Sequence, residues 1–246
     1  MAFQPEYDRY YVDPAIHQLE HEFWLREPTL YKEWTRVRRF REGAQVVLFD
    51  GVQHERLYTM THIERDAVHL ELVTDFDRKL PTRHVYLFWA GLGGAADKRV
   101  VQQATELGVT NFVPLLTGED PAPEFDQAAA RAVAIAAATQ AGRSDLPHIR
   151  GPITIAEMLK EYAGDVRLLT ADAQPLEPPR PKGATAGPAP RQLGKPVGII
   201  VGPDRGWGEP ELALLKKAKV GKLTLSHLNL RSETAVIAAA AKLLIN

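Results

Sequence analysis

From His84 onward, apolar segments of strand length alternate with helix-like segments, and this alternation restricts the possible folds more than any other feature. The strand-like segments lie at 85–90, 109–116, 166–169, 197–201 and 222–225. The helix-like segments lie at 97–107, 127–140, 155–162, 209–218 and 234–244. Strands that alternate with helices usually pair in parallel, with helices on both faces of the sheet. The pattern therefore predicts an α/β fold with a mostly parallel, doubly wound sheet.

Residues 1–80 follow a different rhythm. The apolar run 44–51 ends in Asp50-Gly51, a strong tight-turn signal, and further runs follow at 56–63 and 67–73. Alternating apolar residues in the last run are typical of a half-buried strand. We therefore predict a small β-barrel-like domain at 1–80 and an α/β domain at 81–246. Within the latter, 173–196 is rich in proline, glycine and alanine, which favours a flexible insertion.

Composition excludes several classes of protein. With 45% hydrophobic and 25% charged residues, the 246-residue chain is typical of a globular protein. It has no cysteine, which excludes disulfides, thiolate nucleophiles and cysteine-ligated zinc. His17 and His21 are four residues apart but lack an evident third ligand, so no metal is predicted. No apolar stretch is long enough to span a membrane and no leader is evident, so we expect a cytoplasmic protein without a membrane partner.

A basic cluster lies near the N-terminus, although the formal net charge of the chain is only -1. Its arginines are Arg36, Arg38, Arg39 and Arg41, and its aromatic residues are Tyr31, Trp34 and Phe40. Arginines neutralise phosphates, and aromatic rings stack on bases. One interpretation is an RNA-binding surface, and the other is a solvated helix face. Arg143, which follows a glycine stop at Gly142, is a further candidate for a phosphate contact.

The turn from Gly91 to Ala96 allows a different function. Gly91, Gly93 and Ala96 follow a strand and precede a helix, as in the dinucleotide-binding fingerprint. Glu119 or Asp120 lies near the place of a ribose-binding acid. A nicotinamide-dependent oxidoreductase is therefore one alternative.

Two loops near the C-terminus form the strongest candidate site. The strand 197–201 runs directly into Gly202-Pro203-Asp204-Arg205-Gly206-Trp207-Gly208, whose glycines allow a ligand close to the backbone. The second loop, 226–232, precedes the last helix. Ser232 or Thr234 could cap that helix, with Glu233 as a first-turn acid. Arg231 would then oppose the helix dipole, so an anionic partner is expected beside it.

Five sequence elements carry a resemblance to a known family. They are Gly202–Glu209, Leu230–Ala235, Ala104–Val109, Val113–Thr117 and Gln140–Ser144. Together, and in the order that the family has along its chain, they resemble the SPOUT-class methyltransferases that modify N3 of a uridine in bacterial 16S ribosomal RNA. The resemblance extends to a PUA-like N-terminal barrel with an arginine-rich segment and Phe49-Asp50-Gly51.

The resemblance implies an S-adenosylmethionine-dependent rRNA methyltransferase with an RNA-binding barrel, a deep trefoil knot and a site completed across a homodimer. Its partner would be 16S ribosomal RNA or the small ribosomal subunit. Arg231 and Glu233 match the catalytic loop nearest the transferred methyl group. The positions matching cofactor contacts are Leu169, Gly202, Pro203, Gly206, Leu225, Asn229, Leu230 and Thr234. Departures from the family pattern at Asp204, Arg205 and Ser226 keep a third alternative open, a non-catalytic RNA-binding protein on the same fold.

Overall fold

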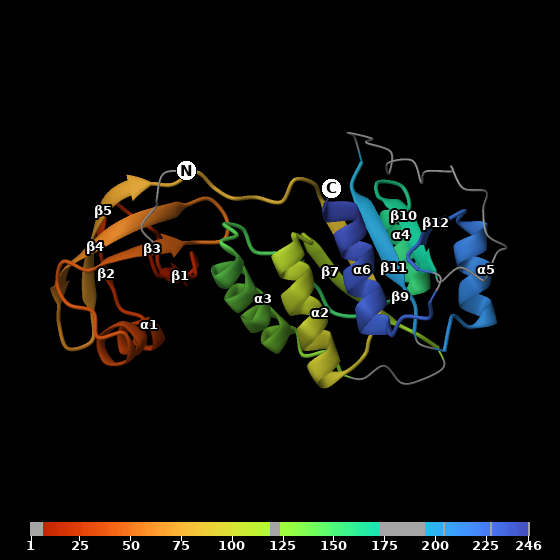
Figure 1. Ribbon diagram of the computed structural model, residues 1–246, viewed down its shortest axis with the longest axis horizontal. Coiled ribbons are helices and arrows are strands. Elements are labelled where there is room, and N and C mark those ends of the chain that lie inside the picture. Colours follow the sequence, from red (N-terminus) through yellow and green to blue (C-terminus); the bar gives the residue numbers. More distant parts are fainter. Residues whose placement is uncertain (1–6, 119–123, 173–194, 204, 227, 246) are drawn as a thin grey trace. The chain divides into compact units, whose positions relative to one another are not determined.

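The computed structural model describes residues 7–118, 124–172, 195–203, 205–226 and 228–245 (Figure 1). The chain divides into two compact units. The first unit comprises Met1–Leu80 and Ala138–Leu146, and the second comprises Pro81–Ala137 and Pro147–Asn246. The insertion predicted at 173–196 lies outside the described residues, except for Lys195 and Pro196.

The first unit is built on a five-stranded sheet. Its strands are β1 (Arg9–Tyr11), β2 (Glu22–Leu25), β3 (Gln45–Phe49), β4 (Glu55–Ile63) and β5 (Val68–Asp75). Their order is β1-β3-β4-β5-β2, and β1 is parallel to β3 whereas the other pairs are antiparallel. The three strands predicted for this part of the chain correspond to β3, β4 and β5. The short strands β1 and β2 were not predicted.

A helical segment completes the core of this unit. It consists of α1 (Pro28–Lys32) and one π-helical turn, η1 (Glu33–Val37). Trp34 on η1 is fully buried and packs edge-on against Tyr10, with 5.4 Å between ring centroids. The same core contains Tyr58 and Met60 from β4. The π turn thus directs its one tryptophan into the core, and its one arginine, Arg36, remains exposed.

The returning segment Ala138–Leu146 is held to the first unit by a buried ionic network around Arg9. The Arg9 guanidinium pairs with Glu55 at 3.0 Å and donates to the carbonyl oxygen of Thr139 at 2.9 Å. Glu55 also accepts a hydrogen bond from the hydroxyl of Ser144, which in turn accepts from the backbone N–H of Lys79 at 2.7 Å. Because Glu55 is 5% exposed, its charge requires this set of partners. The domain boundaries predicted from the sequence had placed this segment entirely in the α/β domain.

The second unit contains a parallel sheet. Its strands are β6 (Val85–Ala90), β7 (Asn111–Leu116), β8 (His148–Ile149), β9 (Ile153–Thr154), β10 (Arg167–Asp172), β11 (Val197–Val201) and β12 (Gly221–Thr224). The order is β12-β10-β11-β6-β7-β8, with β9 also pairing with β7, and every pair is parallel. The predicted α/β class with a parallel sheet is therefore confirmed. The trefoil knot implied by the resemblance stays a prediction.

Helices cover both faces of this sheet (Figure 1). The first face packs against α2 (Gly94–Leu107), α6 (Ser232–Leu244) and the part of α3 (Gln127–Ala141) that belongs to this unit. The second face packs against α4 (Ile155–Tyr162) and α5 (Glu209–Lys217). Leu87 and Trp89 of β6 enter the first core and Phe88 enters the second, as the alternation of a doubly covered strand requires. No helix among the described residues is long and apolar enough to cross a membrane.

The predicted turn at Asp50-Gly51 closes the hairpin between β3 and β4, and one carboxylate stabilises it. Oδ1 of Asp50 accepts hydrogen bonds from the backbone N–H groups of Val52, Gln53 and His54 at 2.8, 2.7 and 2.9 Å. Gly51 has φ of 75°, which a residue with a side chain adopts at a cost. Burial alone would raise the pKa of Asp50, but the three N–H donors outweigh it and hold that pKa below its ordinary value.

We expect Asp50→Asn to destabilise the protein by about 2 kcal/mol at pH 7, because the ionised acceptor of three hydrogen bonds is lost. A carboxyl group whose pKa is lower in the folded state stabilises the fold at pH values above its unfolded-state pKa, which is about 3.9 for aspartate. This stabilisation disappears as the pH falls through the folded-state pKa. The difference between wild type and variant in urea-unfolding free energy should therefore shrink below about pH 4. An equal difference at pH 7 and at about pH 3 would contradict this assignment.

Candidate functional site

The carboxyl ends of three adjacent parallel strands open into a cavity in the second unit. Its volume is about 340 Å³, within the range of small-molecule sites. Ligands of open α/β sheets bind at such strand ends. The cavity is lined by Ala171, Val201, Gly202, Pro203, Gly206, Trp207, Leu225, Ser226, Leu228, Asn229, Leu230, Ser232 and Ala235.

The first wall of the cavity is the loop that follows β11. Gly202 lies against the Trp207 indole so closely that an added Cβ would be 2.8 Å from Cε2. Gly206 has φ of 82° and donates its N–H to the carbonyl oxygen of Pro203 at 2.9 Å, which closes the turn. Gly208 is the N-cap residue of α5, and its N–H donates to the Glu211 carboxylate at 2.9 Å. The glycines therefore allow the close packing and the positive φ that shape this wall.

The second wall runs from the end of β12 to the first turn of α6. The sequence suggests Ser232 or Thr234 as a helix cap, but the N-cap residue is Arg231, whose side chain forms no capping hydrogen bond. Ser232 is the first residue of α6, 4% exposed, and its hydroxyl donates to the carbonyl oxygen of Gly202 at 3.4 Å. The capping interpretation of Ser232 is therefore wrong. This hydroxyl joins the two loops of the cavity.

The two predicted catalytic residues lie side by side in sequence but have different surroundings. Arg231 is exposed and lies between the cavity residues Leu230 and Ser232. The Glu233 carboxylate is 3.7 Å from the Arg99 guanidinium of α2, and its side chain is 30% exposed. This ion pair joins α6 to α2, so the Glu233 carboxylate is directed toward Arg99.

Six of the eight predicted cofactor positions line the cavity: Gly202, Pro203, Gly206, Leu225, Asn229 and Leu230. The other two do not. Leu169 is buried in β10 and lines a separate hollow near the amino ends of the strands, beside Gly221. Thr234 is exposed on α6. Asp204, one of the positions that depart from the family pattern, lies outside the described residues.

Sequence reasoning missed several cavity residues because they carry no distinctive chemistry. Ala171 is the next-to-last residue of β10 and Val201 is the last of β11, Trp207 packs on Gly202, and Ala235 lies one turn into α6. The available signal was positional, since each is at or just after a carboxyl end of a strand, or near a helix start. Applied residue by residue, the rule for parallel sheets would have found Ala171 and Val201.

The arginine-rich segment of the first unit is exposed as expected. Arg36, Arg38, Arg39 and Arg41 all lie on the surface. Arg38 is partly neutralised, because it pairs with Asp8 at 3.0 Å and with Glu33 at 3.4 Å. Trp34 is fully buried, so the expected stacking of a base on its ring is wrong.

Arg143 does not belong to an exposed basic surface. Its side chain is 6% exposed and forms a two-point pair with Asp145, with both N–O distances 2.8 Å. In such a bidentate pair, the two N–H groups that could bind a phosphate already donate to the carboxylate. The Arg143 guanidinium is therefore not accessible for the predicted phosphate contact.

The glycine turn at 91–96 is occupied by a carboxylate of the chain itself. Asp97 is 6% exposed and accepts hydrogen bonds from the N–H groups of Leu92 at 3.1 Å and Gly93 at 2.9 Å. It also accepts from Nε1 of Trp89 at 2.8 Å. In a dinucleotide fold such N–H groups face a pyrophosphate, which a buried carboxylate would repel. Glu119 and Asp120, the proposed ribose acids, lie outside the described residues.

Comparison with protein families agrees with this geometry. Residues 78–244 match the RNA methyltransferase domain family, and residues 35–73 match the RNA methyltransferase PUA domain. The first match covers well over half of the chain. The chain belongs to the RNA methyltransferase domain family. The nicotinamide alternative therefore has support neither from the family nor from the turn that suggested it.

Individual relatives of this RNA methyltransferase are distant in sequence but match most of its length. A ribosomal RNA small subunit methyltransferase E of Aquifex aeolicus is 25% identical over 214 residues, covering 82% of this chain and 86% of the relative. The protein of the same name from Synechocystis is 28% identical over 215 residues, covering 85% and 68% respectively.

Solved structures share the fold of this RNA methyltransferase over almost its whole length. A Neisseria gonorrhoeae ribosomal RNA small subunit methyltransferase E bound to S-adenosylmethionine has a TM-score of 0.78 at 22% identity, covering 96% of both chains. A putative methyltransferase of Legionella pneumophila, in complex with the same cofactor, has a TM-score of 0.76 at 24% identity and equal coverage.

Proposed function

We propose that the protein is an S-adenosylmethionine-dependent methyltransferase that modifies N3 of a uridine in 16S ribosomal RNA. The observation that carries the proposal is the cavity at the carboxyl ends of β10, β11 and β12, in a chain of the RNA methyltransferase domain family. The named activity of the Aquifex and Synechocystis relatives supports the choice of small-subunit RNA. The cofactor of the Neisseria and Legionella structures supports S-adenosylmethionine.

The residues of the cavity fit this cofactor. Leu225, Leu230 and Trp207 provide apolar contacts for a nucleoside, and the backbone around Gly202 provides polar groups where a Cβ would collide with Trp207. We assign cofactor binding to Gly202, Pro203, Gly206, Leu225, Asn229 and Leu230. Leu169 and Thr234 are left out, since neither lines the cavity. When bound, S-adenosylmethionine supplies an electrophilic methyl group on its sulfonium.

The chain must assist removal of a proton from the base. Uracil N3 carries a hydrogen at neutral pH, so methylation requires loss of that proton and stabilisation of the negative charge that develops on the ring. Arg231 is a permanent cation between two cavity residues and is assigned this electrostatic role. Glu233, paired with Arg99, is assigned as a positioning residue for the first turn of α6. The target base must leave its stack to enter the site.

The exposed arginines of the first unit are assigned to RNA binding. Arg36, Arg39 and Arg41 are exposed, and Arg38 is also exposed, with its positive charge partly balanced by Asp8. Such side chains contact phosphates and position the RNA without reading its sequence. We further propose that the protein acts as a homodimer in the cytoplasm, with 16S ribosomal RNA or the small ribosomal subunit as its partner.

Cofactor binding is tested with Gly202→Ala. The new methyl group meets Trp207 at 2.8 Å and narrows the cavity, so we expect the Kd for S-adenosylmethionine to rise at least about tenfold, equal to about 1.4 kcal/mol. Gly164→Ala is the matched control, because no atom lies within 4 Å of its added Cβ. Calorimetric titration measures both, and NADH should give no saturable heat with the wild type. Equal affinities of the two variants would refute the site.

The reaction is tested with small subunits from a strain that lacks the modification. Wild-type protein and cofactor labelled in the methyl group should place label in 16S ribosomal RNA, recovered as 3-methyluridine after digestion to nucleosides. RNA binding without transfer of label would instead favour the non-catalytic alternative. Label on another nucleoside would reject the proposed target atom.

The catalytic assignment is tested with Arg231→Ala. Loss of one electrostatic group at the reacting centre typically lowers kcat by about 10²–10³-fold, and we expect this loss with an unchanged Kd for the cofactor. Glu233→Gln should have a smaller effect, because the Arg99 pair acts indirectly. Lys160→Ala, which removes an exposed cation from α4, serves as the control. A normal methylation rate of the Arg231 variant would eliminate its role.

A further inference from the structure

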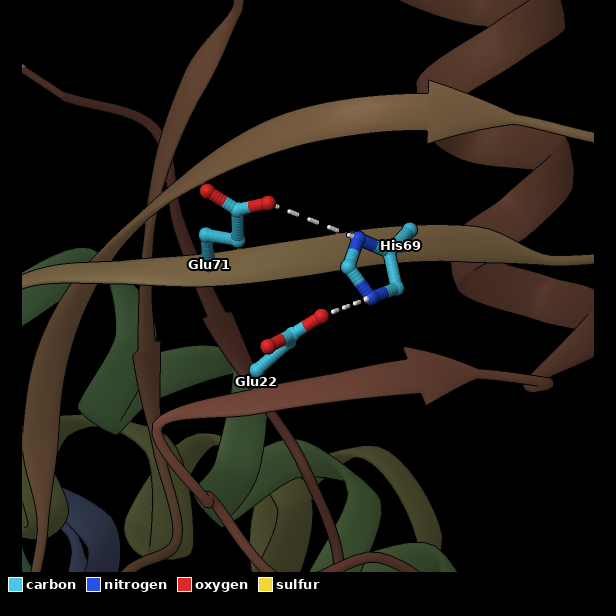
Figure 2. A group of neighbouring side chains, drawn as sticks. All are labelled: Glu22, His69 and Glu71. Carbon is cyan, nitrogen blue, oxygen red and sulfur yellow. Dashed lines mark ion pairs between the residues drawn. The ribbon is translucent and has the colours of Figure 1, made fainter.

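Two carboxylates face each other on the sheet of the first unit. Glu22 of β2 and Glu71 of β5 are direct partners in the antiparallel register. Like charges placed directly opposite across two strands destabilise a sheet. His69 lies two residues before Glu71 on the same strand, so it projects from the same face (Figure 2). The pairing of these strands therefore brings an imidazole between two acids.

The imidazole is held in a defined orientation. His69 is 9% exposed, and its ring packs beside that of Trp24 with 4.9 Å between centroids. Its Nδ1 is 2.6 Å from Oγ1 of Thr61, and its Nε2 is 3.1 Å from Oε1 of Glu22 (Figure 2). Oε1 of Glu71 is 3.9 Å from Nδ1, and its exposed side chain can change rotamer. One ligand atom from each of Glu22, His69 and Glu71 lies within 4.8 Å of the others.

We propose that Nε2 of His69 and the Glu22 carboxylate bind a zinc ion, and that Glu71, which lies on the Nδ1 side of the ring in the structure, becomes the third ligand by a change of rotamer. Two ligands bound tetrahedrally to one zinc ion at about 2.0 Å are about 3.3 Å apart, close to the separation of Nε2 and the Glu22 oxygen. In this arrangement the Thr61 hydroxyl accepts a hydrogen bond from Nδ1–H of His69, and Nε2 is free to bind the metal. Metal-bound histidines commonly donate their second ring N–H to such an outer partner, which fixes the tautomer. One imidazole with two carboxylates suits zinc better than magnesium or calcium, which prefer oxygen ligands alone.

The ion would have a structural role. Three protein ligands leave one tetrahedral position for water. Glu22 belongs to β2, which lies at the edge of the sheet, whereas His69 and Glu71 belong to its neighbour β5. Zinc would neutralise the opposed carboxylates and cross-link the edge strand to the sheet. The site is independent of the cofactor cavity and of the methyl-transfer reaction.

The full chain, freed of metal with a chelator, is titrated with zinc chloride by calorimetry. We expect one zinc ion per chain, a rise in Tm with zinc, and no saturable heat with magnesium. Glu22→Gln and His69→Gln should each weaken zinc binding at least about tenfold and remove the rise in Tm. Because Glu22 is exposed, its variant tests the site without altering the core.

His148→Gln, which alters an exposed histidine of β8, is the control and should bind zinc as the wild type does. Zinc affinity unchanged in Glu22→Gln and His69→Gln would overturn the proposal. Absence of saturable binding by the wild type would also overturn it and would leave a hydrogen bond between His69 and Glu22 alone.

Discussion

The second unit depends on how closely β11 packs between β10 and β6. Gly198 makes this packing possible, because a Cβ there would lie 2.7 Å from Cδ2 of Leu168 and 2.8 Å from Cε2 of Phe88. Close contact of this kind stabilises the protein through dispersion and apolar burial, provided that no side-chain atom forces the neighbours apart. With β11 in this place, its carboxyl end leads into Gly202, whose carbonyl oxygen accepts a hydrogen bond from Ser232 at the start of α6. The cavity is therefore a result of strand packing as much as of the loops that line it.

Much of the fold could be predicted, because the spacing of apolar residues along the sequence indicates which side of a strand or helix is buried. β6, β11 and α4 have the bounds expected from their apolar patterns. β1 and β2 escaped prediction, since a strand of three or four residues has too few alternations to be recognised. Both are stabilised by pairing with distant segments, β1 with β3 and β2 with β5. Such pairing is a tertiary effect that a local pattern does not contain.

The site was predictable where backbone geometry demands glycine, and less so where a polar group has several possible partners. Gly202 and Gly206 were found from their loop. Ser232 resembled a helix cap but bonds to Gly202, and Asp97 fills the turn that resembled a dinucleotide site. The proposed zinc ligands come from strands β2 and β5, separated by more than forty residues, and only strand register brings them together. Which group a polar side chain binds depends on the tertiary structure, and the residue type alone does not determine it.

The network around Arg9 has a consequence for how the chain can be divided. The first unit includes Ala138–Leu146, which begins in the last turn of α3, so the polypeptide passes between the units three times. A fragment ending at Leu80 would leave Glu55 without Ser144, and Arg9 without the carbonyl oxygens at the end of α3. The N-terminal domain is thus not a portable module. In gene fusions or recombination it can be inherited intact only together with the segment that returns to it.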